Sequence, residues 1–424
     1  MKETLIQKIV QGLKDMCYIW AKEMRSTVTD EGVFIFFVLV PILYPLLYSW
    51  IYNNETVHEV PVVVVDNSRS HLSRQFLRQY DAAPGVQIVG HCTSLDEARQ
   101  QVGKQAARGI VYIPSDFETR VNRMEQSVVS VYSDMSLMLY YKAIYQTAVA
   151  VSSDINSKIQ INLAGNVTTR EDQIHAQPLA YDEVALFNPT AGYGSFVIPA
   201  VLILIIQQTL LLGIGLAAGT ARESNRYQDL VPMSRQYHGI FRIVLGKALC
   251  YFMIYAVLAA YLTLVVPRMF HFTALPRPDA LLAVMIPYLL SCIFFGLMLS
   301  CVVRYRENVI LLVVFTSIPL LFLSGVSWPE SAMPGPWKAV AWLFPSTFGV
   351  RAFVRINSMG ATLADVQQEY QALWLQVLAY FFMACLVYRY QIISARQHAA
   401  EKVLAIKEKI QQAKSKKTDN ASTD

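Results

Sequence analysis

The sequence predicts a membrane protein, mainly α-helical, with six transmembrane helices and an α/β external domain inserted between the first and the second. Hydrophobic residues make up 54% of the 424 residues and charged residues 16%, whereas a soluble domain carries about 25% charged residues. The apolar residues gather in blocks long enough to cross a hydrocarbon core, which takes about 20 helical residues. One polar interval between the first two blocks is large enough to be a domain.

Six apolar blocks are the expected transmembrane helices. The first contains Pro41 and Pro45, which a membrane helix tolerates but which favour a kink. We assign residues 31–52 to the first transmembrane helix and residues 191–390 to the other five. An even number of crossings places both termini on the same side of the membrane. The blocks cover residues 33–52, 196–218, 243–266, 281–303, 309–323 and 373–390.

Lys and Arg side chains are concentrated on one side of these spans, and an excess of them in short flanks marks the cytoplasmic side. Both termini are therefore expected in the cytoplasm, with residues 391–424 as a basic tail. The long polar interval is also charged, but long domains translocate regardless of charge. The basic residues of the cytoplasmic side are Lys2, Lys8, Lys14, Lys22, Arg25, Arg222, Arg226, Arg235, Arg242, Arg304, Arg306, Arg389, Arg396, Lys402, Lys407, Lys409, Lys414, Lys416 and Lys417. The opposite side has fewer, namely Arg268, Arg277, Lys338, Arg351 and Arg355.

Residues 1–30 form a predicted amphipathic helix. Its apolar residues recur at helical spacing, with lysines on the other face. Such a helix fits the cytoplasmic surface of the membrane, and the alternative is a helix packed on a partner. The apolar stripe consists of Leu5, Ile9, Leu13, Met16, Trp20 and Met24.

Residues 53–190 are predicted to form the external α/β domain. Short apolar runs alternate with helical stretches, a pattern typical of a small, mainly parallel sheet covered by helices. Ser94 and Glu97 are spaced as a capping box at the start of one helix. The segment 164–190 is polar and is expected to be a connector. The expected strands are 61–66, 86–89, 109–113 and 128–132, and the expected helices are 70–80, 95–107, 116–124 and 136–162.

The loop between the second and third spans, residues 219–242, is polar and short. It is either a solvated connection or a docking segment for a soluble motor, and the residues expected to couple to that motor are Arg222, Glu223, Arg226 and Pro232.

The chain has no ATP-binding loop of its own: Gly246-Lys247 is followed by Ala248, where such a loop needs Ser or Thr.

Residues 324–348, before the last span, are apolar but broken by Pro and Gly. Broken backbone at membrane depth is tolerated only where protein or water covers it, so we expect a re-entrant segment of two short helices at the outer face. It is either an outer gate, with Gly325 as hinge, or a Trp-rich rim that only anchors the protein. The expected gate residues are Gly325, Trp328, Pro329, Met333, Pro334 and Pro345.

Ionisable residues are nearly absent from the spans, and Lys247 is close enough to a cytoplasmic end to snorkel. Ion-coupled transporters need buried Asp, Glu or His, so the sequence favours energy supplied from outside the lipid. The seven histidines are scattered and the six cysteines form no CxxC pair, which leaves metal and disulfide sites without support. The net charge of +5 indicates contact with anionic lipid and not nucleic acid.

Four stretches resemble the ABC type-2 transporter permease family, in its drug- or multidrug-exporter-like subgroup with a large external domain. They are "VPVVVVDNSRSHLSRQF", "LFNPTAGYGSFVIPAVLILIIQQTLLLG", "ARESNRYQDLVPMSRQYHGIFRIVLGK" and "FLSGVSWPESAMPGPWKAVAWLFPSTFGVRAFVRI". One difference is that members often have Gly-Thr shortly after the Arg-Glu pair, where this chain has Asn225-Arg226-Tyr227.

The resemblance implies a permease subunit in a bacterial inner membrane. It would assemble with a second copy or paralogue and with separate subunits that bind ATP and Mg²⁺, and this chain itself would hold no cofactor. Its substrate would be a drug-like, lipid-like or other amphipathic molecule, and a periplasmic adaptor is a possible further partner. The alternatives are a membrane-anchored receptor or scaffold, for which the tail is too short to be an output domain, and an intramembrane enzyme, for which the spans lack catalytic polar residues.

Overall fold

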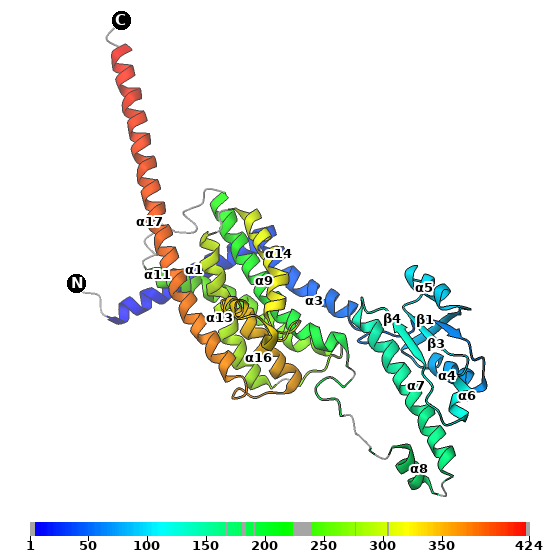
Figure 1. Cartoon of the computed structure of the whole chain (residues 1–424). Coiled ribbons are helices and arrows are strands. Elements are labelled where there is room, and N and C mark those ends of the chain that lie inside the picture. Colours follow the sequence, from blue (N-terminus) through cyan, green and yellow to red (C-terminus); the bar gives the residue numbers. More distant parts are fainter. Residues whose placement is uncertain are drawn as a thin grey trace. The chain divides into compact units, whose positions relative to one another are not determined.

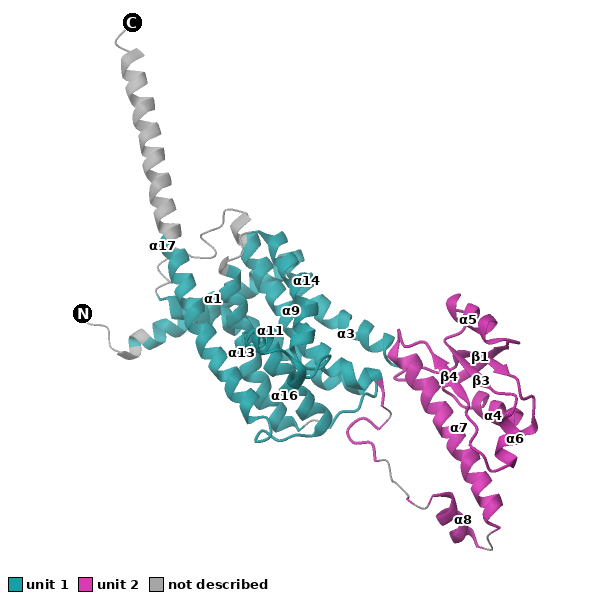
Figure 2. Cartoon of the chain, in the orientation of Figure 1, with its two compact units in different colours: residues 1–53, 193–424 teal, residues 54–192 magenta. Residues whose placement is uncertain are grey.

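The structure, a computed structural model (Figure 1), describes residues 5–420 except 166–167, 178, 180–183, 190, 224–238, 276 and 303–304. Side chains are not described at residues 5, 6, 8, 221–223, 301, 302 and 394–420. The chain divides into two compact units (Figure 2). Unit 1 combines Met1–Asn53 with Tyr193–Asp424, and unit 2 is Asn54–Gly192.

Unit 1 is helical throughout the part that is described. Its first helices are α1 (Leu5–Thr29), α2 (Glu31–Phe34), the π-helical turn η1 (Ile35–Leu39) and α3 (Val40–Ile51). After unit 2 follow α9 (Tyr193–Glu223), α11 (Ile240–Ala260), the π-helical turn η2 (Tyr261–Val265), α12 (Val266–Met269), α13 (Pro278–Val302) and α14 (Arg306–Leu323). The last elements are the 3₁₀ turn η3 (Glu330–Ala332), α15 (Gly335–Ala341), α16 (Pro345–Met359) and α17 (Gln367–Asn420).

Six helical stretches in the described part of the chain are long and apolar enough to cross a membrane. They are Glu31–Ile51, Tyr193–Thr220, Ile240–Met269, Pro278–Ser300, Arg306–Leu323 and Gln367–Ile393. Each contains or closely overlaps one of the apolar blocks found in the sequence. Together with the four-stranded sheet of unit 2, they confirm the predicted fold class.

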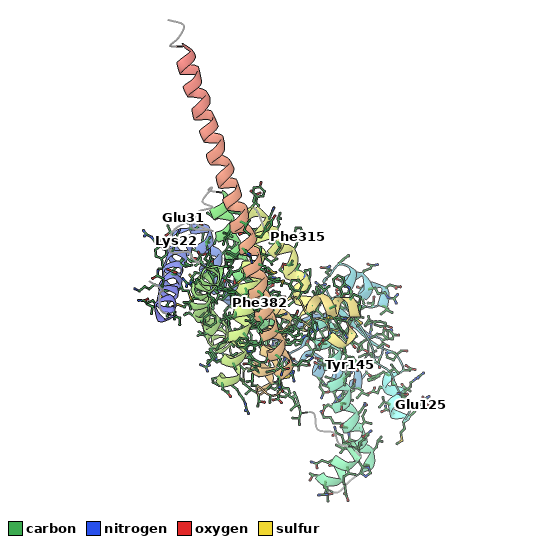
Figure 3. The ribbon with its side chains drawn as sticks, turned by 90° about the vertical axis from the view of Figure 1, so that its left-hand side faces the viewer. Lys22, Glu31, Glu125, Tyr145, Phe315 and Phe382 are labelled. Carbon is green, nitrogen blue, oxygen red and sulfur yellow. The ribbon has the colours of Figure 1, made fainter. Side chains whose placement is uncertain are left out.

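The core of unit 1 forms around α9 and α13. In the apolar part of these two spans, 89% and 72% of the residues are buried, against 22% for α14. The helices around them expose apolar side chains, as Phe315 on α14 and Phe382 on α17 illustrate (Figure 3); they are 74% and 57% exposed. Apolar side chains at the surface of a helix long enough to span are suited to contact with lipid or another subunit.

A ring cluster fixes the first span against the core. Phe37, in the π-helical turn η1, is fully buried, and its ring centroid lies 5.4 Å from that of Tyr251 and 4.8 Å from that of Tyr255. Gly213 of α9 makes room for this ring: a Cβ there would lie 2.5 Å from Phe37 Cε2 and 2.7 Å from Cγ. The absence of a side chain at Gly213 therefore sets how closely the first two spans pack.

Unit 2 is a four-stranded sheet in the order β2-β1-β3-β4, in which β1 pairs in parallel with β2 and β3, and β4 is antiparallel. The strands are β1 (Val60–Asp66), β2 (Val86–His91), β3 (Gly109–Ile113) and β4 (Ser130–Ser133). The helices are α4 (His71–Asp81), α5 (Leu95–Gly103), α6 (Phe117–Asn122), α7 (Met138–Ala164) and α8 (Thr169–Ala176). The mainly parallel sheet expected from the sequence is confirmed.

Two helices of unit 2 differ from the prediction. The Ser94 hydroxyl caps α5 by accepting from the Glu97 N–H at 3.2 Å, as expected, but the helix ends at Gly103 instead of continuing to residue 107 because glycine is a poor helix former. The segment expected to be only a connector contains α8, which begins with a complete capping box formed by Thr168 and Glu171.

Candidate functional site

The predicted coupling segment joins α9 to α11. Arg222 and Glu223 are the last two residues of α9, and their side chains are not described. Arg226 and Pro232 lie outside the described residues. The segment leaves from the most buried span and enters α11, which begins at Ile240. A force applied to the segment would therefore reach the core of unit 1 through these two helices.

A buried ion pair holds α1 against α11. The Lys247 ammonium donates to both carboxylate oxygens of Glu23, at 2.9 and 2.8 Å, and the Tyr251 hydroxyl donates to one of them. Lys247 is only 7% exposed. A buried charge is strongly destabilising unless a partner neutralises it, so Glu23 and Lys247 depend on each other.

A second ion pair lies along the same two helices. Arg242 Nη1 is 2.8 Å from Asp15 Oδ2, and the Gln11 amide donates to the other Asp15 oxygen at 3.3 Å. Between the two ion pairs, Gly246 lets the helices approach closely: a Cβ there would lie 3.0 Å from the Cβ of Ile19. We call Asp15, Glu23, Arg242, Lys247 and Tyr251 the helix clamp.

The clamp residues Asp15 and Glu23 of α1 share one face with Ile19, because the three are spaced four residues apart. The predicted apolar stripe lies beside this face, and its members Ile9 and Leu13 are 55% and 56% exposed. The assignment of Lys247 to snorkelling was wrong, since Glu23 neutralises it inside the protein. A lysine within an apolar span needs a partner, and this signal could have led to the acidic residues of α1.

A third ion pair ties the same end of the bundle together. Arg306, the first residue of α14, lies 3.7 Å from Asp30, whose carboxylate also caps α2 by accepting from the Val33 N–H at 3.2 Å. Two glycines leave room for the arginine side chain. A Cβ at Gly32 would lie 2.6 Å from Arg306 Nη2, and a Cβ at Gly219 would lie 3.0 Å from Arg306 Cγ. The ends of the first, second and fifth spans therefore meet beside the helix clamp.

At the other end of α14 the chain turns back into unit 1. Gly325 has a φ of +89°, which glycine adopts at little cost. Pro329 and Pro334 are the N-cap residues of η3 and α15, and Pro345 is in the first turn of α16, where its missing N–H leaves no bond unmade. We call residues 324–359 the hairpin.

The tip of the hairpin reaches the middle of two spanning helices. The Tyr380 hydroxyl of α17 donates to the Leu343 carbonyl, and the Ser346 N–H donates to Oε1 of Gln207 at 2.6 Å. Both Tyr380 and Gln207 lie near the centres of their spans. The backbone at the tip is thus bonded by side chains from neighbouring helices, as a low-dielectric environment requires.

Two arginines anchor α16. Arg351 lies 2.6 Å from Glu330 and donates through Nε to the Ser324 carbonyl at 3.2 Å, while Arg355 lies 2.9 Å from Glu369 of α17. The sequence pattern predicts both arginines in a connection at the outer face. They lie on α16, and their ion pairs link this helix to η3 and to the last span.

The predicted gate residues Trp328 and Met333, and the two tryptophans Trp337 and Trp342 of the same segment, do not share one environment. Trp328, Trp337 and Trp342 are 54%, 58% and 48% exposed, whereas Met333 is 8% exposed. The tryptophans thus lie at the surface of a single copy of the chain, available to lipid or to a second subunit, whereas Met333 and Pro345 are buried.

Unit 2 carries an open groove of about 560 Å³. One wall is apolar and the other is formed by hydroxyl and amide side chains of α7, and no charged residue lines it. Its walls include Phe76, Val129, Val131, Ser152, Asn156 and Gln160.

Comparison with known proteins agrees with this architecture. The family model described as "ABC-2 family transporter protein" matches residues 32–386, which span both units. No curated protein matches the chain. Within the described residues, no three His, Cys, Asp or Glu side chains are grouped to hold a metal ion. Members of this family are membrane components of ABC transport systems and are not themselves catalytic. The chain belongs to the ABC-2 transporter family, as a membrane subunit that implies an ATP-binding partner.

Proposed function

We propose that this chain is the permease subunit of a bacterial exporter that moves a drug-like, lipid-like or other amphipathic molecule out of the cytoplasm or inner leaflet. Two permease subunits, identical or paralogous, would form the path in the inner membrane, and ATP and Mg²⁺ would bind to separate subunits. The Lys and Arg bias of the flanks supports cytoplasmic termini, which makes unit 2 the external domain of the proposed subgroup.

The observation that carries the proposal is the ion-paired junction of α1 with α11. The coupling segment 219–242, with Arg222, Glu223, Arg226 and Pro232 as its contact residues, leads directly into α11. Since Glu23 and Lys247 bind α1 to this helix, a movement of the ATPase would displace both helices together. The exposed Ile9 and Leu13 fit a helix that also lies in the membrane surface.

At the opposite end of the bundle, the hairpin is the proposed outer gate. Its ion pairs and its tip contacts hold it between spanning helices in one copy of the chain. Gly325 is the proposed hinge, because it combines a positive φ with a position directly after α14. The exposed tryptophans would contact lipid or the second subunit, and unit 2 would receive the substrate or an adaptor.

The proposal is tested by an uncoupling variant. A fluorophore attached to Gly335→Cys, where a side chain meets open space, reports on the hairpin in the complex of permease and co-purified ATPase in nanodiscs. We expect ATP to change its fluorescence in wild type and to leave it unchanged in Glu223→Ala, with ATPase binding intact.

A matched control is Glu307→Ala, which removes an exposed carboxylate at the start of α14. An ATP response preserved in Glu223→Ala would remove this residue from the coupling site, and the absence of any co-purified ATPase would refute the proposed function.

The receptor or scaffold remains the second candidate, favoured by the uncharged groove of unit 2. A receptor of this kind would need no ATPase, so the same co-purification decides between the two.

A further inference from the structure

The tip of the hairpin buries polar groups that have no partner. Gln207, Ser346 and Thr347 are fully buried. Gln207 Oε1 accepts from the Ser346 N–H at 2.6 Å and from the Cys292 thiol at 3.8 Å. Within the described residues, the Gln207 amide nitrogen and the hydroxyls of Ser346 and Thr347 have no hydrogen-bond partner.

The hydroxyls of Ser346 and Thr347 differ from three buried hydroxyls of unit 1 that lie further along their own helices. Thr209, Thr263 and Ser300 donate to carbonyls of their own helix, at 2.7, 2.7 and 2.8 Å. Ser346 and Thr347 lie in the first turn of α16, where no preceding helical turn supplies a carbonyl. Their bonds must therefore come from outside the helix.

The geometry limits what the missing partner can be. The three unpaired groups offer N–H and O–H donors and two hydroxyl acceptors. Both hydroxyls belong to the first turn of α16, and Gln207 accepts from a backbone N–H of that turn, where the helix dipole favours an oxygen atom. None of these side chains, nor Cys292, is charged. An ion here would lack a counter-charge, whereas a neutral molecule that both donates and accepts can bond to groups of both kinds.

We propose that the tip of the hairpin is a binding site for water, formed by Gln207, Ser346 and Thr347. Buried waters in proteins typically make about three hydrogen bonds to such orphaned groups, which is the number of side chains that this site supplies. The bound water would lie between α9, α13 and α16. A hydroxyl or amide group of a transported molecule could replace it there. The inference rests on the geometry of the tip alone and does not depend on the proposed direction of transport.

X-ray hydroxyl-radical footprinting of the full chain in nanodiscs tests the site, because the radicals form from bound water and react with the side chains next to it. Cys292 is the reporter, since it contacts Gln207 and is fully buried. Cys385, buried on α17, is the reference for dose. We expect Cys292 to be oxidised in wild type and its oxidation to fall several-fold in Thr347→Val, while Cys385 stays unchanged.

The matched control is Thr263→Val, which removes an equally buried hydroxyl that is bonded to its own helix; it should leave Cys292 oxidation as in wild type. Ser346→Ala takes the place of Thr347→Val if the latter does not fold. An unmodified Cys292 in wild type would overturn the proposal, and so would equal oxidation of Cys292 in wild type and in the folded tip variant.

Discussion

Glu23→Ala is expected to destabilise unit 1 by about 3–5 kcal/mol, the usual cost of removing one partner from a buried ion pair. The variant leaves the Lys247 ammonium, which is 7% exposed, without its counter-charge and the Tyr251 hydroxyl without its acceptor. Thermal unfolding of the purified protein in nanodiscs measures the effect as a lower unfolding temperature.

Two further variants show whether the lower stability of Glu23→Ala comes from the unpaired charge of Lys247. The double variant Glu23→Gln with Lys247→Met removes both charges and should recover much of the stability, because no buried charge is then left without a counter-charge. Glu31→Ala removes an exposed carboxylate nearby (Figure 3) and should have little effect. If Glu23→Ala unfolded at the same temperature as Glu31→Ala, the helix clamp would not stabilise the bundle.

Gly213→Ala is expected to be the most damaging substitution of a glycine in unit 1. The new methyl group would overlap the ring of Phe37, and that ring cannot move aside because Tyr251 and Tyr255 pack against it. Overpacking of a filled core costs about 1–3 kcal/mol and occasionally more. The measurement is again the unfolding temperature in nanodiscs.

A smaller side chain in place of Phe37 should restore the stability of Gly213→Ala. Phe37→Leu combined with Gly213→Ala is expected to be more stable than Gly213→Ala alone, since the leucine side chain leaves room for the methyl group. Gly335→Ala is the control, because its methyl group meets no atom within 4 Å. Wild-type stability in Gly213→Ala would mean that the first two spans are not packed as closely as the structure has them.

The sequence predicted the spans well because lipid imposes a simple rule: each crossing needs a long apolar helix. It predicted the sheet because the strands of unit 2 are apolar runs bounded by turns, as in β1 and β3. The small helix α8 was missed because its residues are polar, although the Thr168 and Glu171 capping box was visible in the sequence.

The sequence could not predict α16. Its 15 residues include Arg351 and Arg355, so hydropathy places them at a water-exposed surface. In the structure Glu330 of η3 and Glu369 of α17 neutralise the two arginines, and most other residues of α16 are buried. The same limit applies to Glu23 and Lys247, which are 224 residues apart.

The coupling residues Arg222, Glu223, Arg226 and Pro232 remain predictions from the sequence, as their side chains lie outside what the structure describes. The gate residues are described, and they lie in different surroundings: the prolines and Gly325 shape the hairpin, Met333 packs inside, and Trp328 lies at the surface.

In the proposed transporter, α1 and α11 move as one body and carry the movement of the ATPase into the bundle. A disulfide between Ile19→Cys and Gly246→Cys tests it directly, in a background without the native cysteines. The two Cβ positions lie 3.0 Å apart, slightly closer than the about 3.5–4.5 Å typical of disulfides, so a small shift suffices for the bond to form. After oxidation, the fluorophore at Gly335→Cys is read with and without ATP in the assembled complex. We expect the ATP-dependent fluorescence change to persist in the cross-linked protein. A change that disappears on oxidation and returns on reduction would show that α1 must slide against α11, and would contradict the proposed movement of the two helices as one body.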